Sequence, residues 1–487
     1  MQSLFDTKTD TDTDTDTETT MPTTEHDLAF LPVHEMASAM AAGRLTSARI
    51  VETFLERIER HESKLQAFVS VYAEDALRAA RAADEAAVAR HRVGPFHGIP
   101  IAVKDIVDIE GRITTGGCKV WEKRVSTHTA TLVKKLVGAG MIVIGKTHSV
   151  EFAMGSWGTN THMGSPWNPW DLAEHRAPGG SSSGTGVAVG AGLAPWGIGT
   201  DTGGSVRVPS AWCGLAGLKT TLGRISVHGV LPLAESLDTP GPLCRDVEDA
   251  ALLYNLLQGP DPLDPLTAIP VPADPLPQLR RGVAGLVLAR LPAAERAQVD
   301  AEVLAAYDAS LEVLQRLGAR LVEVSLPRAF VDLGAMVGRL IGCEGYAHVG
   351  ELVDDPSLPV DPHVRPRIQL GRGVSARDYL HLLREVGQLT RDWAQALDGC
   401  DALLTPTTLT AAPRVADVDQ GGTAAVFTRA INLVGGCALA VPNGFTGNGL
   451  PVSLQIACPA YQEATALRIG WALEQGTEWH RRHPDLG

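Results

Sequence analysis

Three side chains could form a hydrolytic site without any histidine: Lys104, Ser181 and Ser205. Ser181 lies in the glycine-rich stretch PGGSSSG (residues 178–184), and Ser205 lies in GTDTGGSVR (residues 199–207). Lys104 closes the apolar run IPIAVKD (residues 99–105). A serine hydroxyl is a weak nucleophile until a base takes its proton. Together the three residues could supply a nucleophile, a proton relay and a base.

The two glycines before Ser205 favour a backbone site for a negative charge. Successive glycines let backbone N–H groups converge on one point, as in an anion-binding nest. The same geometry stabilises the oxyanion of a tetrahedral intermediate, where one donor contributes about 3 kcal/mol. A plain glycine turn is the alternative interpretation of this stretch.

Lys104 stands at the end of a predicted strand, where a charged side chain is unusual unless the strand end is exposed. Burial disfavours the ammonium form and lowers the pKa of a lysine, so that the neutral amine can act as a base. The alternative is an exposed lysine paired with Asp105.

The sequence stretches around Lys104, Ser181 and Ser205 resemble those of the amidase signature family, the Ser-Ser-Lys hydrolases. The resemblance runs from about Glu35 to the C-terminus and is densest between Phe96 and Pro242. It implies that Ser205 attacks the substrate carbonyl and that Lys104 is the base. It also implies that Ser181 follows a cis peptide bond, receives the proton of Ser205 and passes it to the leaving amine.

The resemblance also assigns supporting roles. It implies backbone oxyanion donors at Thr202, Gly203, Gly204 and Ser205. It implies that Asp201 and Arg207 brace the nucleophile loop, with Gly180 and Ser182 supporting the relay serine. It implies an acyl pocket lined by Met154, Gly155 and Ser156. The stretches GLKT (residues 217–220), PGP (240–242) and GLPVSLQ (449–455) fit the family as scaffold.

The implied activity is hydrolysis of carbon–nitrogen bonds other than peptide bonds, in linear amides, through an acyl-enzyme. We expect a stand-alone amidase for small uncharged amides, aryl or alkyl, whose machinery could extend to anilides, esters and carbamates (urethanes). We expect no cofactor. We also expect no metal, because His128, His148, His162 and His175 show no metal-site spacing with carboxylates.

Two alternatives remain open. The stretch around Ser182 satisfies G-x-S-x-G, the nucleophile elbow of α/β-hydrolases, but residues 171–178 are too polar for the buried strand that an elbow requires. The second alternative is the catalytic A-type subunit of a tRNA-dependent amidotransferase. Against it stand the acidic chain and the residues Val208, Pro209 and Ser210, where that subunit type more often has glutamine, proline and alanine. A phosphate-binding loop is excluded, because no lysine follows Gly186.

Composition indicates an ordinary globular protein. The chain has 487 residues, 44 % hydrophobic and 20 % charged, with a net charge of −14 and no basic patch. We therefore expect a small-molecule substrate and neither nucleic acid nor membrane as a partner; a homodimer is left open. Seven scattered cysteines without a C-x-x-C pair, and an acidic N-terminus without a secretory signal, favour the cytoplasm.

The pattern of elements predicts an α/β fold. Helices are expected over residues 47–60, 73–89 and 130–137, and short apolar strands over 99–103 and 141–144. Such alternation favours a large mixed, twisted β-sheet flanked by α-helices on both sides. A segment over 185–192 has poor helix propensity, but its small residues permit close packing.

We expect one amidase-signature domain over residues 27–487, after a disordered acidic Thr/Asp-rich tail at 1–26. Within it we expect N-terminal helices at 27–95 and a catalytic core at 96–257. A proline-rich linker and a variable helical insert follow at 258–400, and the chain returns to the sheet at 401–487.

Overall fold

The computed structural model describes residues 24–268 and 272–487, and most of the predicted tail lies outside them. Helix α1 begins at Glu25, two residues before the expected start of order at Asp27, because Thr24 and Asp27 form a capping box. Within the described residues, no helix combines the length and apolar character needed to cross a membrane.

One mixed sheet of eleven strands organises the described chain, in the order β1-β3-β2-β4-β6-β5-β10-β11-β9-β7-β8. The pairs β2–β3, β2–β4, β7–β8 and β7–β9 are parallel, and the others are antiparallel. The strands are β1 Phe68–Val71, β2 Pro100–Lys104, β3 Ile142–Thr147, β4 Gly197–Asp201, β5 Ala216–Lys219, β6 Thr239–Cys244, β7 Val287–Arg290, β8 Arg320–Glu323, β9 Ala402–Pro406, β10 Cys437–Phe445 and β11 Pro451–Cys458.

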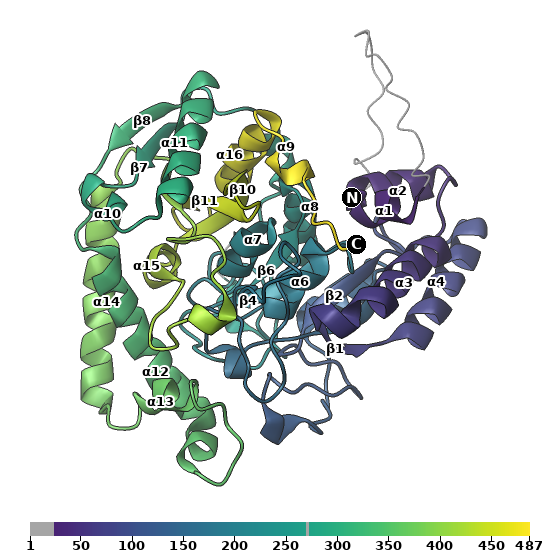
Figure 1. The fold of residues 1–487 in the computed structure, drawn as a ribbon, viewed down its shortest axis with the longest axis horizontal. Helices are drawn as coiled ribbons and strands as arrows, with labels where there is room; N and C mark the ends of the chain where they lie inside the picture. The colour runs from purple at the N-terminus through teal and green to yellow at the C-terminus, as the bar shows by residue number, and fades with distance from the viewer. Residues whose placement is uncertain (1–23, 269–271) are drawn as a thin grey trace.

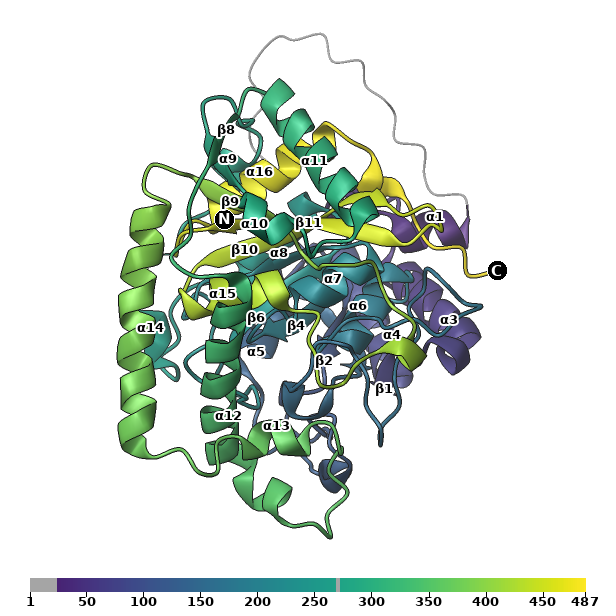
Figure 2. The ribbon, with the colours of Figure 1, turned by 60° about the vertical axis from the view of Figure 1, so that its left-hand side comes forward.

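Helices cover both faces of this sheet, as expected. Helices α8, α11 and α16 pack on one face, and α6 and α7 pack together on the other (Figures 1 and 2). The α-helices are α1 Glu25–Phe30, α2 Val33–Ala41, α3 Ser47–Leu65, α4 Ala73–Val88, α5 Thr131–Gly138, α6 Ser183–Gly190, α7 Arg207–Cys213, α8 Val247–Leu257, α9 Leu276–Leu279, α10 Ala293–Arg296, α11 Ala301–Arg316, α12 Phe330–Asp354, α13 Arg365–Gln369, α14 Ala376–Ala396, α15 Val426–Leu433 and α16 Glu463–Gln475.

Helix α6 forms where propensity alone disfavours it. All eight of its residues are buried, and its small side chains let it pass close to neighbouring backbone. A side chain at Gly184 would collide with the carbonyl oxygen of Ala67 and the amide of His148. Packing against the sheet thus outweighs the cost of glycine in a helix.

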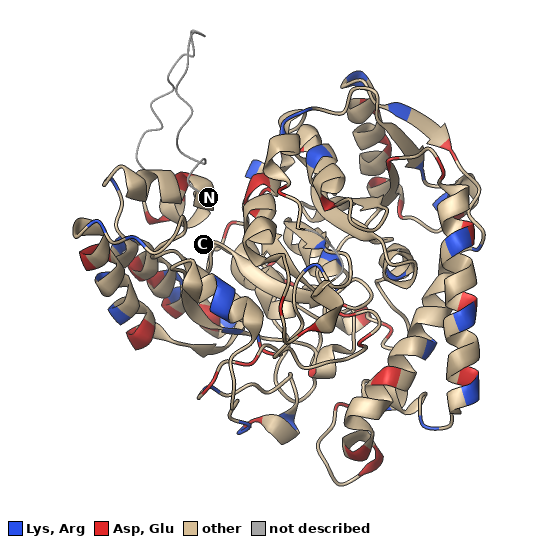
Figure 3. Ribbon diagram, turned by 180° about the vertical axis from the view of Figure 1, so that it is seen from behind, with Lys and Arg blue, Asp and Glu red and all other residues tan. Residues whose placement is uncertain are grey.

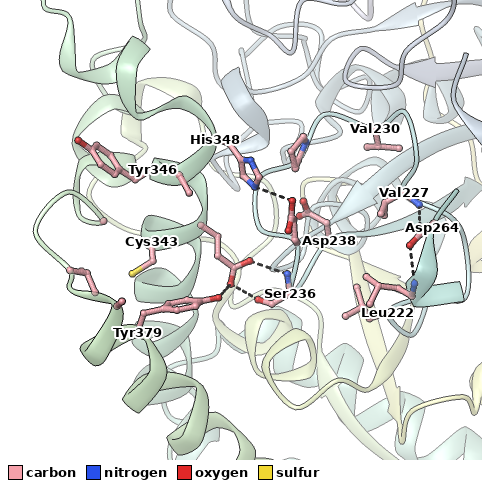
Figure 4. A pocket seen from close by; sticks show the side chains of 18 of the residues that line it. Leu222, Val227, Val230, Ser236, Asp238, Asp264, Cys343, Tyr346, His348 and Tyr379 are labelled. Carbon is pink, nitrogen blue, oxygen red and sulfur yellow. Dashed lines mark hydrogen bonds and ion pairs between the residues drawn. The ribbon is translucent and has the colours of Figure 1, made fainter. Parts of the chain in front are cut away.

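The long helices α12 and α14 form an arm beside the sheet, to the left in Figure 1. Arginines and acids are interspersed along α14, which lies at the right in Figure 3. A cavity of about 1020 Å³ separates this arm from the loop over residues 231–238 (Figure 4). Glu344 of α12 bridges the gap, because its carboxylate accepts hydrogen bonds from the Ser236 amide at 2.9 Å and the Tyr379 hydroxyl at 2.9 Å.

Candidate active site

Lys104 lies at the carboxyl end of β2, beside the parallel strand β4. The carboxyl ends of parallel neighbours meet at one edge of a sheet, so that Lys104 reaches the residues that follow β4. Its side chain is fully buried, and Nζ lies 2.7 Å from Ser181 Oγ and 2.9 Å from Thr200 Oγ1. The structure therefore excludes the exposed lysine paired with Asp105; Asp105 instead pairs with Lys146 at 2.7 Å.

The surroundings of Lys104 favour a neutral amine. Burial lowers its pKa to about 7, while the carboxylates of Asp238 and Asp201 oppose this shift. Two hydroxyl groups, rather than a carboxylate, lie within hydrogen-bonding distance of Nζ. A lysine in this environment can accept a proton near neutral pH.

Ser181 follows a cis peptide bond between Gly180 and Ser181, the geometry that the resemblance implied. The next residue, Ser182, precedes helix α6 and is buried. Its hydroxyl donates to the Thr200 carbonyl and accepts from the Thr200 amide, each at 3.3 Å. No strand precedes it over residues 171–178, so that the elbow interpretation of Ser182 is wrong.

Ser205 lies in the turn between strand β4 and helix α7, and it lines a small cavity of about 40 Å³. The Ser205 carbonyl accepts a hydrogen bond from the Ser182 amide at 3.3 Å, which joins the two serine loops. Within the described part of the chain no hydrogen bond joins the hydroxyls of Ser181 and Ser205. Catalytic hydrogen bonds often tighten only when substrate is present.

Asp201 and Arg207 brace this turn from a fully buried position. Arg207 binds the Asp201 carboxylate through two nitrogens, at 2.8 and 3.0 Å, and also donates to Asn432 and Gln455. Burial alone would raise the pKa of Asp201, but the charge and hydrogen bonds of Arg207 lower it well below its usual range. Asp201 thus remains charged, and its pair with Arg207 holds the loop before α7.

The four predicted oxyanion donors are not equivalent. The Gly204 amide already donates to Asp201 Oδ1 at 2.8 Å, so that it is not free to bind an oxyanion. Gly204 instead has a structural role, because its φ of +135° and the neighbouring Thr428 leave no room for a side chain. The amides of Thr202, Gly203 and Ser205 donate to no group within the described residues, and they remain available.

Met154, Gly155 and Ser156 line the same cavity as Ser205. Ser156 Oγ accepts a hydrogen bond from the Ala424 amide at 2.9 Å, and it lies 3.0 Å from Thr423 Oγ1. These bonds join the segment to the loop before helix α15. The structure thus gathers the predicted pocket residues around the predicted nucleophile.

Several further residues at the site were not predicted. Thr200 lies against Lys104, and Asp238 receives a hydrogen bond from the hydroxyl of Thr202. Arg367 and Arg429 reach the cavity from helices α13 and α15. Asp238 stands two residues before PGP (240–242), and its position next to this family motif is a signal that could have identified it.

Comparisons with known proteins agree with this geometry. The family model for Amidase matches residues 49–467. This chain belongs to the amidase family. It is 38 % identical to the A-type subunit of glutamyl-tRNA(Gln) amidotransferase from Chloroflexus aggregans, over 94 % of this chain and 99 % of the relative.

Solved structures show the same fold. The crystal structure of the corresponding glutamyl-tRNA(Gln) amidotransferase chain, also of A type, from Thermotoga maritima aligns with a TM-score of 0.78 and 30 % identity, over 93 % of this chain and 96 % of the other. The peptide amidase from Stenotrophomonas maltophilia aligns with a TM-score of 0.82 and 28 % identity, over 93 % and 98 % of the two chains. The amidase-signature fold and an enzyme acting on carbon–nitrogen bonds are therefore established for this chain.

The expectation of a stand-alone amidase for small uncharged amides is wrong. The curated relative matches along nearly its whole length and is named as one subunit of an amidotransferase. Val208, Pro209 and Ser210, which differ from the residues expected of an amidotransferase subunit, are buried in helix α7. Helix α7 packs against α6.

The expectation of a small-molecule substrate without nucleic acid is wrong for the same reason. The relatives from Chloroflexus aggregans and Thermotoga maritima are named for an enzyme of glutamyl-tRNA(Gln). The net charge of −14 describes one chain alone.

Proposed function

We propose that this chain is the amide-cleaving A-type subunit of a tRNA-dependent amidotransferase. The observation that carries the proposal is the match to the Chloroflexus aggregans relative, at 38 % identity over 94 % of this chain and 99 % of the relative. Two contacts support the proposal: Lys104 Nζ lies 2.7 Å from Ser181 Oγ, and the Ser182 amide donates to the Ser205 carbonyl at 3.3 Å. In the proposed role this chain releases ammonia from an amide donor, and the assembly transfers that nitrogen to glutamyl-tRNA(Gln).

In the proposed reaction Ser205 Oγ attacks the carbonyl carbon of the donor amide. Ser181 gives its own proton to neutral Lys104 as it takes the proton of Ser205, so that Lys104 is the base. Lys104 then returns a proton to Ser181, and Ser181 delivers a proton to the amide nitrogen. The amides of Thr202, Gly203 and Ser205 stabilise the negative charge on the former carbonyl oxygen. The C–N bond then breaks, and ammonia leaves an ester on Ser205.

Water completes the cycle. It attacks the ester carbon and loses a proton to the Ser181–Lys104 pair, and the C–O bond to Ser205 breaks with return of a proton to the serine. The products are the free carboxylic acid and ammonia. An amide nitrogen is a poor leaving group unless it is protonated, which is why a relay beside a neutral lysine supports this chemistry.

The test uses the tagged chain, isolated from its native cells together with any subunits that copurify. Glutamyl-tRNA(Gln) is supplied with L-glutamine, L-asparagine or glutaramate as the amide donor, and formation of glutaminyl-tRNA(Gln) is measured. We expect transfer that the Ser205→Ala variant loses with every donor. The same variant should retain transfer with ammonium chloride, because only the release of ammonia is removed.

Two results would contradict the proposal. One is a preparation that hydrolyses an amide but never converts glutamyl-tRNA(Gln). The other is donor-dependent transfer that persists in the Ser205→Ala variant.

A further inference from the structure

A cavity of about 370 Å³ lies where the carboxyl end of helix α14 meets helix α15 and strands β9 and β11. None of its described lining residues is shared with the cavity at Ser205. The proposed reaction therefore gives this cavity no role. Its volume is within the range of about 300–1,000 Å³ that is typical of sites for small molecules.

The walls of this cavity are apolar. Trp393 and Leu397 line one side, Leu403 and Ile431 line another, and the thiol-bearing Cys458 completes the wall. Trp393, Leu403 and Ile431 are at most 6 % exposed, although each borders the cavity. The cavity is therefore deep and narrow, and a ligand inside it would contact mostly hydrocarbon.

The rim of the cavity does not resemble a docking face for a protein. Its exposed members are Ala394, Asp398, Gly399, Pro459 and Ala460. No large exposed apolar side chain is among the described residues that line the cavity. A protein interface would be expected to present a contiguous apolar patch at the surface. A small molecule suits this narrow opening better.

The charges at the cavity favour an uncharged ligand. Asp398 is the charged member of the described lining, and it lies exposed at the rim. Its carboxylate would repel an anion at the entrance. A cation that passed the rim would be buried among apolar groups without a counter-ion, which is strongly disfavoured.

Size and shape favour an aromatic ligand of two rings. A cavity of about 150 Å³ lined by apolar side chains holds one benzene molecule, and this cavity has about 370 Å³. The indole of Trp393 borders it, and paired aromatic rings are more favourable than their buried area alone indicates.

Helix α15 connects this cavity to the nucleophile loop, because it lies between α14 and α7 (Figures 1 and 2). Ile431 of α15 lines the cavity. From the same helix Thr428 Oγ1 donates to the Gly203 carbonyl at 2.7 Å, and Asn432 Nδ2 donates to Asp201 Oδ1 at 2.9 Å. A ligand that packs against α15 thus touches the helix that holds the loop of Ser205.

A row of aromatic rings forms a second connection. The ring of Trp393 meets Phe330 edge-on, with 6.1 Å between centroids, and Phe330 meets Phe427 edge-on at 5.0 Å. Phe427 directly precedes Thr428 in α15. Closely packed rings transmit a displacement, because a protein interior has little free volume.

We propose that this cavity binds an uncharged aromatic molecule of two rings, and that the bound molecule acts on the Ser205 loop through helix α15. The ligand packs between Trp393 and Ile431 and restrains α15. A restrained loop holds its backbone donors in the geometry that the reaction needs. The site is distinct from the amide-donor site and does not depend on transfer to tRNA.

Two cysteines of the chain report on occupancy. Cys400 lines this cavity, and Cys343 lines the separate cavity beside helix α12; both are half-buried. The full-length protein is alkylated with N-ethylmaleimide, and both peptides are followed by mass spectrometry. We expect 2-naphthalenemethanol to slow alkylation of Cys400 at least about tenfold when it is present at ten times its Kd. Alkylation of Cys343 should not change.

Charged compounds of the same size and two matched variants sharpen the test. We expect 2-naphthoate and 2-naphthylmethylammonium to protect Cys400 much less, because burial of a charge is costly. Ala394→Trp fills the rim from an exposed position of α14 and should abolish protection. The control Gln395→Trp places the same side chain at the next exposed position, which does not line the cavity, and should retain protection.

Labelling of Ser205 by a serine-directed fluorophosphonate measures the effect on the nucleophile loop. Saturating 2-naphthalenemethanol should accelerate it about fivefold, at the lower end of typical coupling between sites. The acceleration should be lost in Ala394→Trp and kept in Gln395→Trp.

Four results would overturn the inference. They are equal alkylation of Cys400 with and without 2-naphthalenemethanol, equal protection of Cys400 and Cys343, equal protection by the neutral and charged compounds, and protection without any change in the labelling of Ser205. Protection by copurified subunits but not by the naphthalene would assign the cavity to a protein partner and would also overturn it. Failure of transfer to tRNA would overturn only the proposed function, because neither readout involves tRNA.

Discussion

Lys104 depends on its neighbours for a pKa near neutrality. Burial lowers its pKa to about 7, whereas the negative charges of Asp238 and Asp201 oppose that shift. Asp238 is itself buried, and burial raises its pKa to about 6 even though Thr202 and two backbone amides bind its carboxylate. Amide cleavage should therefore rise with pH through about 7, as Lys104 loses its proton and becomes a base.

Replacing Asp238 by asparagine should move this rise to lower pH. The variant removes a negative charge that stabilises protonated Lys104, so that the amine loses its proton more readily. A rotated asparagine amide can still accept from Leu233 and Ala234 and donate to Thr202. The pH profile of kcat/KM checks this, with Glu351→Gln, an exposed carboxylate on α12, as the control. A rise that stays in place or moves to higher pH would contradict the role of Asp238.

Among single residues, the sequence predicted those that lie within short motifs of the family. Such motifs contain Lys104, Ser181, Asp201 and Arg207. In the structure Lys104 contacts Ser181, although 77 positions separate the two residues in the sequence. Arg429 lies in no such motif. It reaches the cavity only because α15 packs beside the nucleophile loop, and packing between distant segments is not visible in local patterns.

Among the elements, apolar runs predicted β2 and β3, because buried strands of a mixed sheet are rich in such residues. Strands β4 (GIGTD) and β6 (TPGPLC) were not predicted. Their glycines and prolines are typical of turns. Both are nonetheless buried and paired in the sheet, where glycine admits close neighbours such as the side chain of Ser182 against Gly199.

The arm formed by α12 and α14 positions the loop over residues 231–238. Glu344 holds Ser236, which lies at the pocket of Figure 4. The same loop carries Leu233 into the Ser205 cavity and Asp238 onto Thr202. The Glu344→Gln variant exchanges an acceptor oxygen for a donor and should cost about 1 kcal/mol of this contact. Hydrogen exchange should then accelerate at the amides of Leu233 and Ala234, which bind Asp238.

Amide turnover should also fall in the Glu344→Gln variant, because Leu233 and Asp238 lose their fixed positions. The matched control is Glu351→Gln, on the same helix but exposed, which should leave exchange and turnover unchanged. Accelerated exchange with full activity would show that the loop does not position the site.

For the whole molecule, the fold class was predictable and the partners were not. Alternating helices and strands indicated a mixed sheet covered on both faces, and one sheet of eleven strands is present in the described chain. Net charge misled the prediction of partners, because it averages over a surface and does not describe an assembly. Division of the chain into a tail, core, insert and return remains a prediction.

The central claim is that Ser205 is the nucleophile and that Lys104 activates it through Ser181. The most direct measurement is peptide mapping by mass spectrometry after the full chain reacts with a serine-directed fluorophosphonate. The account predicts an adduct on the peptide containing Ser205, absent in Ser205→Ala and formed much more slowly in Lys104→Ala. An adduct on the peptide containing residues 181–183, or a labelling rate that Lys104→Ala leaves unchanged, would contradict it.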